Sequence, residues 1–171
     1  MLSNGKSLLA EQSSMFENIY HIKESIIPEH FCNKIIKDGE LATIKEAEIA
    51  DGNSANRSSK ISWLNDKELQ KTLSHFVQSA NKESNWNFSL KEFESLQYTV
   101  YNKGDHYNWH TDSHVKPYRN NTIRKLSFTL CLNDEYEGGD FEICDPHPEP
   151  DLSKTTTFTF KKGSIIVFLV T

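Results

Sequence analysis

The sequence lacks a long hydrophobic run, an obvious leader and an excess of basic residues. Its longest apolar stretch, Ile165–Val170, has six residues, whereas a membrane-spanning helix needs roughly 20. The N-terminus, Met1–Lys6, leads into a run of only three apolar residues before Glu11, too few for a signal peptide. The net charge of −5 argues against a protein that grips phosphate backbones, because that affinity comes from clustered Lys and Arg. We therefore expect neither a membrane nor a nucleic-acid partner, and the oligomeric state is left open.

Cysteines are also scarce. Cys32, Cys131 and Cys144 form no C-x-x-C pair, and one of the three cannot be matched within the chain. This usage predicts a reduced, cytoplasmic protein. It also disfavours a structural zinc protein, because the spacing of zinc ligands is missing.

Aromatic residues, by contrast, are plentiful: 10 Phe, 6 Tyr and 3 Trp in 171 residues. A chain of this length and composition predicts one domain, residues 1–171, with a buried core. The first helix is expected to begin near Pro28, with one apolar face made of Phe31, Cys32, Ile35 and Ile36. Gly39 blurs its end, so residues 41–49 continue the helix or begin a strand.

A second helix is predicted from apolar residues at helical spacing: Leu69, Leu73, Phe76, Val77 and Ala80. Asn65 followed by Glu68 is typical of a capping box at its start. Before this helix, residues 51–56 form a polar loop, and Ile61 and Trp63 alternate with Ser62 as in a short strand.

From Glu94 onward the hydrophobic period changes to two. Alternation predicts strands around 96–101, 126–132 and 158–160, and Ile165–Val170 is a continuous apolar strand. Helices followed by many strands predict an α+β fold containing a β-sandwich or barrel. We divide the domain into a helical N-terminal layer, residues 1–93, and a strand-rich core, residues 94–171.

The central chemical feature is His110-Thr111-Asp112. If this stretch is extended, the imidazole and the carboxylate point to the same face and converge. One nitrogen and one hard oxygen ligand supply two-thirds of a 2-His-1-carboxylate facial triad, which leaves positions on ferrous iron open for substrate and oxygen. An isolated H-x-D pattern, however, is common in unrelated loops.

The residues around this motif carry a wider pattern, which resembles the Fe(II)/2-oxoglutarate dioxygenase family, in particular its prolyl 4-hydroxylase-like branch. The pattern spans residues 94–168 and includes Gln97–Tyr101, Gly104, Tyr107, Trp109–Asp112, Arg124–Ser127, Leu132–Asn133, Tyr136–Asp140 and Lys162–Phe168. Residues 57–63 resemble a segment that flanks the family's active-site mouth. The resemblance implies a double-stranded β-helix, or jelly roll, with N-terminal helices packed on it.

The resemblance also implies the site and its cofactors. His110 and Asp112 match the first two iron ligands, and no catalytic residue beyond the metal ligands is assigned. Tyr101 matches a tyrosine that reaches toward 2-oxoglutarate, and Ser127, Thr129 and Cys131 line the wall of that pocket. The implied cofactors are Fe(II), 2-oxoglutarate as co-substrate and L-ascorbate. The implied reaction hydroxylates a prolyl residue in a peptide or protein, with succinate and CO2 as co-products.

The sequence departs from the family pattern at its C-terminal end. The third ligand, a histidine, and the Arg or Lys that pairs with the distal carboxylate of 2-oxoglutarate are expected after Phe168, and neither is present. Lys161 and Lys162 precede the strand and are expected to be solvated. One or two final strands are also expected to be absent, which predicts an open sheet edge, an exposed apolar run at Ile165–Val170 and low stability.

Three explanations for this departure remain open, of which we favour the first. The chain is a truncated form with reduced or no activity, it uses His106, His114 or His147 as a substitute ligand, or it is a catalytically inactive jelly-roll binding module. A nucleic-acid demethylase on the same fold is disfavoured because no basic cluster with interleaved aromatics is found. The substrate itself depends on variable loops, here residues 51–60 and 113–122.

Overall fold

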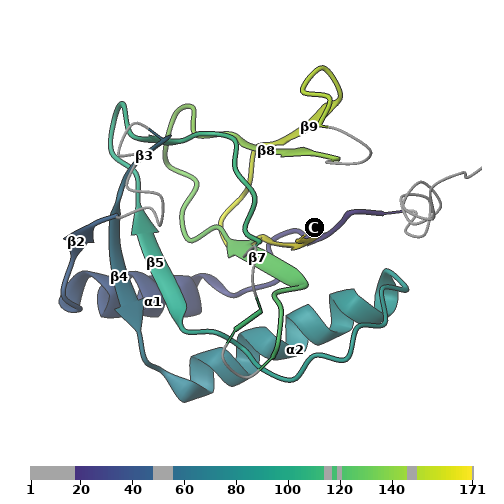
Figure 1. The fold of residues 1–171 in the computed structure, drawn as a ribbon. Coiled ribbons are helices and arrows are strands. Elements are labelled where there is room, and N and C mark those ends of the chain that lie inside the picture. The colour runs from purple at the N-terminus through teal and green to yellow at the C-terminus, as the bar shows by residue number, and fades with distance from the viewer. Residues whose placement is uncertain (1–17, 48–55, 114–116, 119–120, 146–149, 171) are drawn as a thin grey trace, which may run out of the picture.

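The computed structural model describes residues 18–47, 56–113, 117–118, 121–145 and 150–170 (Figure 1). These residues form an α+β arrangement of two helices and short strands. In chain order the elements are β1 (Tyr20–Lys23), α1 (Glu29–Leu41), β2 (Lys45–Glu46), β3 (Arg57–Ser58), β4 (Lys60–Leu64), α2 (Lys67–Glu83), β5 (Leu96–Val100), β6 (His106–Tyr107), β7 (Leu126–Leu130), β8 (Phe141–Cys144), β9 (Thr155–Phe158) and β10 (Ile165–Leu169).

The strands pair antiparallel in four small sheets. Their orders are β1-β10-β7, β2-β4-β5, β3-β6 and β8-β9. Three of the pairings join the N-terminal part of the chain to the C-terminal part: β1 with β10, β4 with β5, and β3 with β6. Residues 1–93 therefore supply strands to the sheets as well as the two helices.

The apolar run at 165–170 is buried, so its predicted exposure is wrong. Strand β10 is central in its sheet, with β1 on one edge and β7 on the other. Ile165, Ile166 and Val167 are at most 2% exposed. The prediction failed because it overlooked β1, which pairs with β10 from Tyr20↔Phe168 to Lys23↔Ile165.

Helix α1 begins and packs close to expectation. Pro28 is its N-cap, and the helix runs through Gly39 to Leu41, so of the two alternatives for residues 41–49 the strand is found, as β2. Cys32 and Ile35 are buried, as the apolar face predicted. A side chain at Gly39 would overlap the ring of Tyr98 on β5, and the Gly39 carbonyl accepts a hydrogen bond from Ser62 on β4, at 2.8 Å. The missing side chain thus lets the helix lie directly on this sheet.

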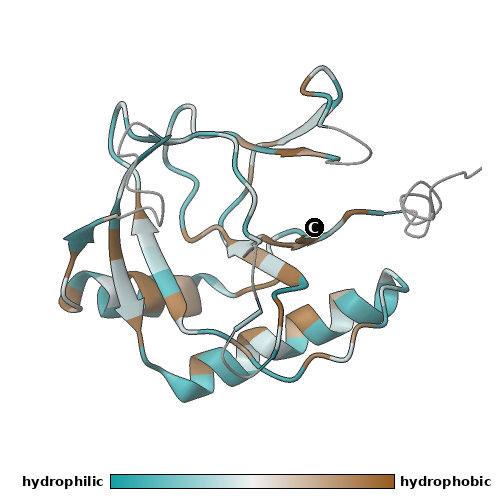
Figure 2. Ribbon diagram, viewed as in Figure 1, coloured by the Kyte–Doolittle hydropathy of each residue, from teal (hydrophilic) through white to brown (hydrophobic). Residues whose placement is uncertain are grey.

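Helix α2 has the predicted face but a different cap. Asp66, rather than Asn65, accepts hydrogen bonds from the backbone N–H groups of Glu68 and Leu69, both at 2.9 Å. Both residues are good N-caps, and the register of the helix selects the second. The polar side of α2 faces away from the sheets, while its apolar residues face the core (Figure 2).

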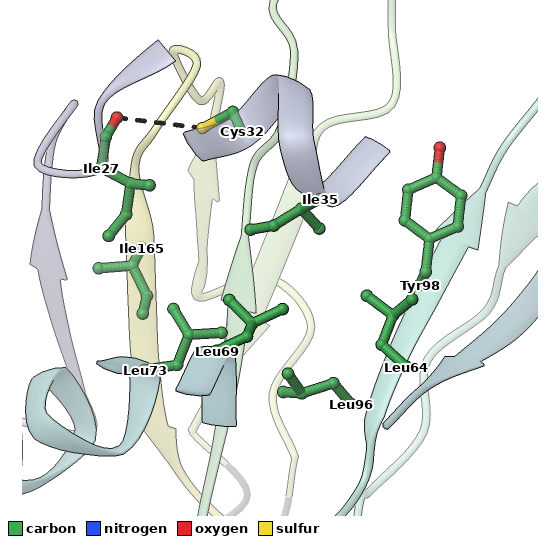
Figure 3. Packing of buried hydrophobic residues seen from close by; sticks show 9 residues of the cluster. All are labelled: Ile27, Cys32, Ile35, Leu64, Leu69, Leu73, Leu96, Tyr98 and Ile165. Atoms are coloured by element: carbon green, nitrogen blue, oxygen red, sulfur yellow. Dashed lines mark hydrogen bonds between the residues drawn. The ribbon is translucent and has the colours of Figure 1, made fainter. Parts of the chain in front are cut away.

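The core lies between the two helices and the sheets. Figure 3 shows its main cluster, to which both helices and strands β4, β5 and β10 contribute. Its members are Ile27, Cys32, Ile35, Leu64, Leu69, Leu73, Leu96, Tyr98 and Ile165. A second cluster joins α2 to β10 through Val77, Ala80, Trp86 and Val167. All three cysteines are free thiols, as predicted.

The face of the β1-β10-β7 sheet that points away from the helices carries both polar and apolar side chains. Ser127 and Thr129 on β7 lie opposite Phe168 and Ile166 on β10, so these four share one face. Phe168 contacts Phe141 of the β8–β9 hairpin, with ring centroids 5.7 Å apart. In Figure 1 this hairpin and α2 lie on opposite sides of β7. Gly138 and Gly139, which precede the hairpin, have positive φ, as the expected tight turn requires.

Candidate active site

His110 and Asp112 meet in the segment that connects β6 to β7. Nε2 of His110 lies 3.3 Å from Oδ1 of Asp112, and their side chains are 37% and 29% exposed. The predicted convergence of the two groups is therefore present. Its cause differs from the expectation, because residues 108–113 form no strand. Their orientation depends instead on contacts made by neighbouring side chains and carbonyl groups.

The His110 ring is held from two directions. Its Nδ1 lies 2.7 Å from the carbonyl oxygen of Asn108, which accepts a hydrogen bond from Nδ1–H and leaves Nε2 for a partner on the side of Asp112. One face of the ring stacks on Tyr107, at 3.6 Å between centroids and 13° between planes. The guanidinium of Arg57 lies 4.5 Å from the centroid of the Tyr107 ring. The three groups form a column of guanidinium, phenol and imidazole.

Asp112 is held by residues at the start of β7. Its carboxylate accepts a hydrogen bond from Ser127. Its backbone carbonyl accepts one from Nη1 of Arg124, at 2.8 Å. The remaining nitrogens of Arg124 form a bidentate ion pair with Glu94, at 2.8 Å and 2.6 Å. The carboxylate of Asp112 is thereby aimed at His110 from a fixed backbone.

The electrostatics of the pair favour its charged forms. Burial alone would raise the pKa of Asp112, but hydrogen bonds from His110 and Ser127 and the nearby charges outweigh it, so this pKa is lowered. Burial would likewise lower the pKa of His110, yet its hydrogen bonds to Asp112 and to the Asn108 carbonyl hold that pKa above the ordinary value. A divalent cation that binds both groups would displace the proton from Nε2 of His110 and would replace His110 as the partner of the Asp112 carboxylate.

Tyr101 lies beside this column, immediately after β5. Its hydroxyl hydrogen-bonds with Arg57 and Ser59, and burial raises its pKa. Arg57 also donates to Ser59 at 2.8 Å and to Gln97 at 2.9 Å. The position of Tyr101 next to an arginine agrees with a role toward an anionic ligand, but its contact with 2-oxoglutarate stays a prediction.

The three predicted wall residues on β7 and just beyond it do not behave alike. Ser127 interacts with the carboxylate of Asp112, one of the two predicted metal ligands. Thr129 shares its sheet face. Cys131 turns to the other end of the strand, where its thiol lies 3.0 Å from the Asn133 carbonyl and 3.8 Å from the Tyr136 hydroxyl. The structure therefore links Ser127 to Asp112, a predicted metal ligand, while Cys131 contacts Asn133 and Tyr136.

No third ligand joins the pair within the described part of the chain. Across residues 18–47, 56–113, 117–118, 121–145 and 150–170, no group of three His, Cys, Asp or Glu side chains is placed to hold a metal. His106 lies on β6, opposite Ser58 of β3. His114 and His147 lie outside the described residues, so these two substitute ligands stay untested. Lys162 pairs with Glu29 at 2.9 Å.

Two supporting residues were not assigned a role from the sequence. Glu94 opens the period-two region and Tyr107 lies three residues before His110, but neither carries a local signal for its partner. Glu94 pairs with Arg124, which lies 30 residues further along the chain. Tyr107 contacts Arg57, which lies in a different strand. Only the fold brings Glu94 to Arg124 and Arg57 to Tyr107.

Residues 96–171 match the family model described as the 2OG-Fe(II) oxygenase superfamily. No curated protein sequence matches the chain. Among solved structures, the chain is similar to the viral collagen prolyl hydroxylase of Paramecium Bursaria Chlorella virus-1, solved as a 2OG complex, with a TM-score of 0.63 and 19% identity over 90% of this chain and 79% of that one. It is also similar to a Pseudomonas putida prolyl-4-hydroxylase, with a TM-score of 0.63 and 14% identity over 95% of this chain and 85% of that one.

These matches confirm the family resemblance and the fold class predicted from the sequence. The chain has an α+β jelly-roll fold of the kind found in these prolyl hydroxylases. The matched segment contains both His110 and Asp112. Within the described residues, neither helix is long and apolar enough to cross a membrane.

Proposed function

We propose that this chain, whose residues 96–171 carry the pattern of the 2OG-Fe(II) oxygenase superfamily, is an Fe(II)- and 2-oxoglutarate-dependent dioxygenase that hydroxylates a prolyl residue in a peptide or protein. The co-products are succinate and CO2. One observation carries the proposal: Nε2 of His110 and Oδ1 of Asp112 lie 3.3 Å apart, inside the segment that matches the family.

The chemistry of this pair fits ferrous iron. An imidazole nitrogen and a carboxylate oxygen are two of the ligand types in the 2-His-1-carboxylate set. When bound, the iron would activate O2, with 2-oxoglutarate oxidised to succinate and CO2 as one oxygen atom enters the prolyl residue and the other enters succinate; no protein side chain provides this chemistry. His110 and Asp112 would hold the metal, and L-ascorbate is proposed to keep it ferrous.

The protein's own contribution is orientation and proton handling. The Asn108 carbonyl keeps a proton on Nδ1 of His110, so that Nε2 is the atom available to the metal. Ser127 donates to Asp112 and reduces the freedom of its carboxylate. Binding of the cation then requires only the loss of the Nε2 proton to solvent.

The co-substrate is proposed to lie between the ligand pair and the polar face of β7. Tyr101, Ser127 and Cys131 are the residues that we assign to it. Tyr101 and Arg57 bring a phenol and a cation to one side of the site, where an anionic group gains a charge-assisted partner. The peptide substrate is proposed to approach from the side of Trp109, which precedes His110 in the chain and is 46% exposed. The cytoplasm is the proposed location.

The number of ligands sets the expected level of activity. The described residues offer two ligands in contact, and a metal site needs its full set to offset desolvation and ordering. We therefore expect residues 1–171 by themselves to bind iron weakly and to turn over 2-oxoglutarate slowly or not at all.

The test is product analysis. The Fe(II)-loaded chain is incubated with 2-oxoglutarate, ascorbate and a library of proline-containing peptides, and mass spectrometry follows succinate and peptides that have gained one oxygen. Oxygen gain that disappears in the H110A/D112A variant supports the proposal. Turnover that is unchanged in that variant would overturn the assignment of the ligands. Tight peptide binding without any oxidation would favour the second candidate, an inactive binding module on the same fold.

A further inference from the structure

We propose that Arg124 and Glu94 act together as a positioning pair for Asp112, holding its backbone so that the carboxylate faces His110. The inference rests on the proposed function, because the positioned group is the proposed metal ligand. It assigns to Arg124 and Glu94 a task that the ligands themselves cannot perform.

Arg124 uses separate nitrogens for two tasks. Nε and Nη2 bind the two carboxylate oxygens of Glu94, at 2.8 Å and 2.6 Å. Nη1 donates to the backbone carbonyl of Asp112, at 2.8 Å. A bidentate pair fixes the plane of a guanidinium, and that plane sets the direction in which Nη1 points.

The position of Arg124 in the chain supports its role in orienting Asp112. Arg124 lies two residues before β7, and Ser127, within β7, donates to the Asp112 carboxylate. One short stretch of chain therefore holds Asp112 both at its backbone and at its side chain. The segment that carries Asp112 forms no strand of its own, so contacts from side chains such as Arg124 and Ser127 contribute to its position.

Glu94 is the outer member of the arrangement. Its side chain is 50% exposed, whereas that of Arg124 is 24% exposed. An exposed ion pair contributes little to global stability. Its expected effect is therefore local: it orients Arg124, and Arg124 orients Asp112.

The first experiment measures binding of Mn²⁺, a redox-stable probe of the site, by calorimetry. R124A is expected to weaken binding by about 10- to 100-fold, the range typical of lost outer-shell contacts. R124K is expected to recover part of this loss, because an ammonium can reach one of the two partners. E94Q is expected to cost less than R124A, and E94Q/R124A no more than R124A, because Glu94 acts through Arg124.

The matched control is E83Q, which neutralises a similarly exposed carboxylate, 45% exposed, whose ion pair is with Lys23 on β1 rather than with a residue of the candidate site. It is expected to leave Mn²⁺ affinity unchanged. Equal affinity in R124A and the parent chain would overturn the proposal. An equal loss in E83Q and R124A would also overturn it, since the effect would then be general.

A second measurement does not depend on the metal. Hydrogen–deuterium exchange of the metal-free chain is expected to speed up in residues 108–113 in R124A and E94Q, and to stay at the parent rate in E83Q. Unchanged exchange in that segment would overturn the positioning role. If the parent chain binds no Mn²⁺ but the segment loosens as expected, the proposed metal site fails while the positioning role stands.

Discussion

The two faces of the β1-β10-β7 sheet differ in what holds them. On the helical side, Ile165 and Val167 are almost completely buried against α1 and α2. On the other side, Ser127 on β7 contacts Asp112, and the ligand pair is about one-third exposed. The first face gains free energy from apolar area removed from water. The second combines the packing of Phe168 on Phe141 with hydrogen bonds and ion pairs around Asp112, so stability and metal binding should respond to different substitutions.

The largest effect on stability is expected at the buried face. I165A removes most of a side chain that is 2% exposed and should lower the free energy of unfolding by about 3 kcal/mol, because transfer and cavity effects add. Urea denaturation measures this. A loss below about 1 kcal/mol would mean that the cluster in Figure 3 is not closely packed.

A smaller loss is expected where α1 meets β5. In G39A the new methyl group would overlap the Tyr98 ring, which should cost about 2 kcal/mol through displaced packing. Alanine favours a helix over glycine by about 1 kcal/mol, so the sign of the measured change decides between the two effects. We expect net destabilisation in thermal unfolding. A stabilised G39A would show that the helix does not approach the sheet so closely.

On the sheet face that carries Ser127, a substitution should change metal binding more than it changes the free energy of unfolding. S127A removes the hydroxyl that donates to Asp112 and is expected to weaken Mn²⁺ binding about 10-fold, as for other outer-shell partners. Its unfolding free energy should change little, since Ser127 is only partly buried. Calorimetry gives the Mn²⁺ affinity and urea denaturation gives the free energy of unfolding, both on the same sample. A large loss of stability would break the separation between the two faces.

The smallest effect is expected at the start of α2. D66A removes the cap from the N–H groups of Glu68 and Leu69 and should cost about 1 kcal/mol. The hydrogen bond from the Leu69 N–H, followed by that from Lys34, lowers the pKa of Asp66. Its contribution is thus complete above the ordinary pKa of an aspartate and is lost as pH falls through the lowered value. The stability difference between D66A and the parent chain should therefore disappear in strong acid.

Local patterns predicted most of the elements but not their partners. The apolar faces of α1 and α2 and the alternation in β5 and β7 follow from spacing within a few residues. The pairing of β1 with β10 joins residues almost the full chain apart, and no short pattern signals it. That omission produced the mistaken open edge at Ile165–Val170.

The candidate site shows the same limit. The H-x-D pattern indicated which two residues meet, but the assumed extended strand was not the reason. Arg124 contacts Asp112 directly, while Arg57 and Glu94 contact the neighbouring Tyr107 and Arg124, respectively, and only the fold creates these contacts. Charged residues on a surface carry no local signal of such roles, because their usual state is solvated.

We propose that His110 and Asp112 together bind a divalent metal, which 2-oxoglutarate then also binds. Calorimetric titration of the chain with Mn²⁺, with and without 2-oxoglutarate, tests it most directly. We expect weak binding at one site, tightened by 2-oxoglutarate and abolished in H110A/D112A while the fold is retained. Binding of equal strength in the parent chain and in H110A/D112A would contradict it.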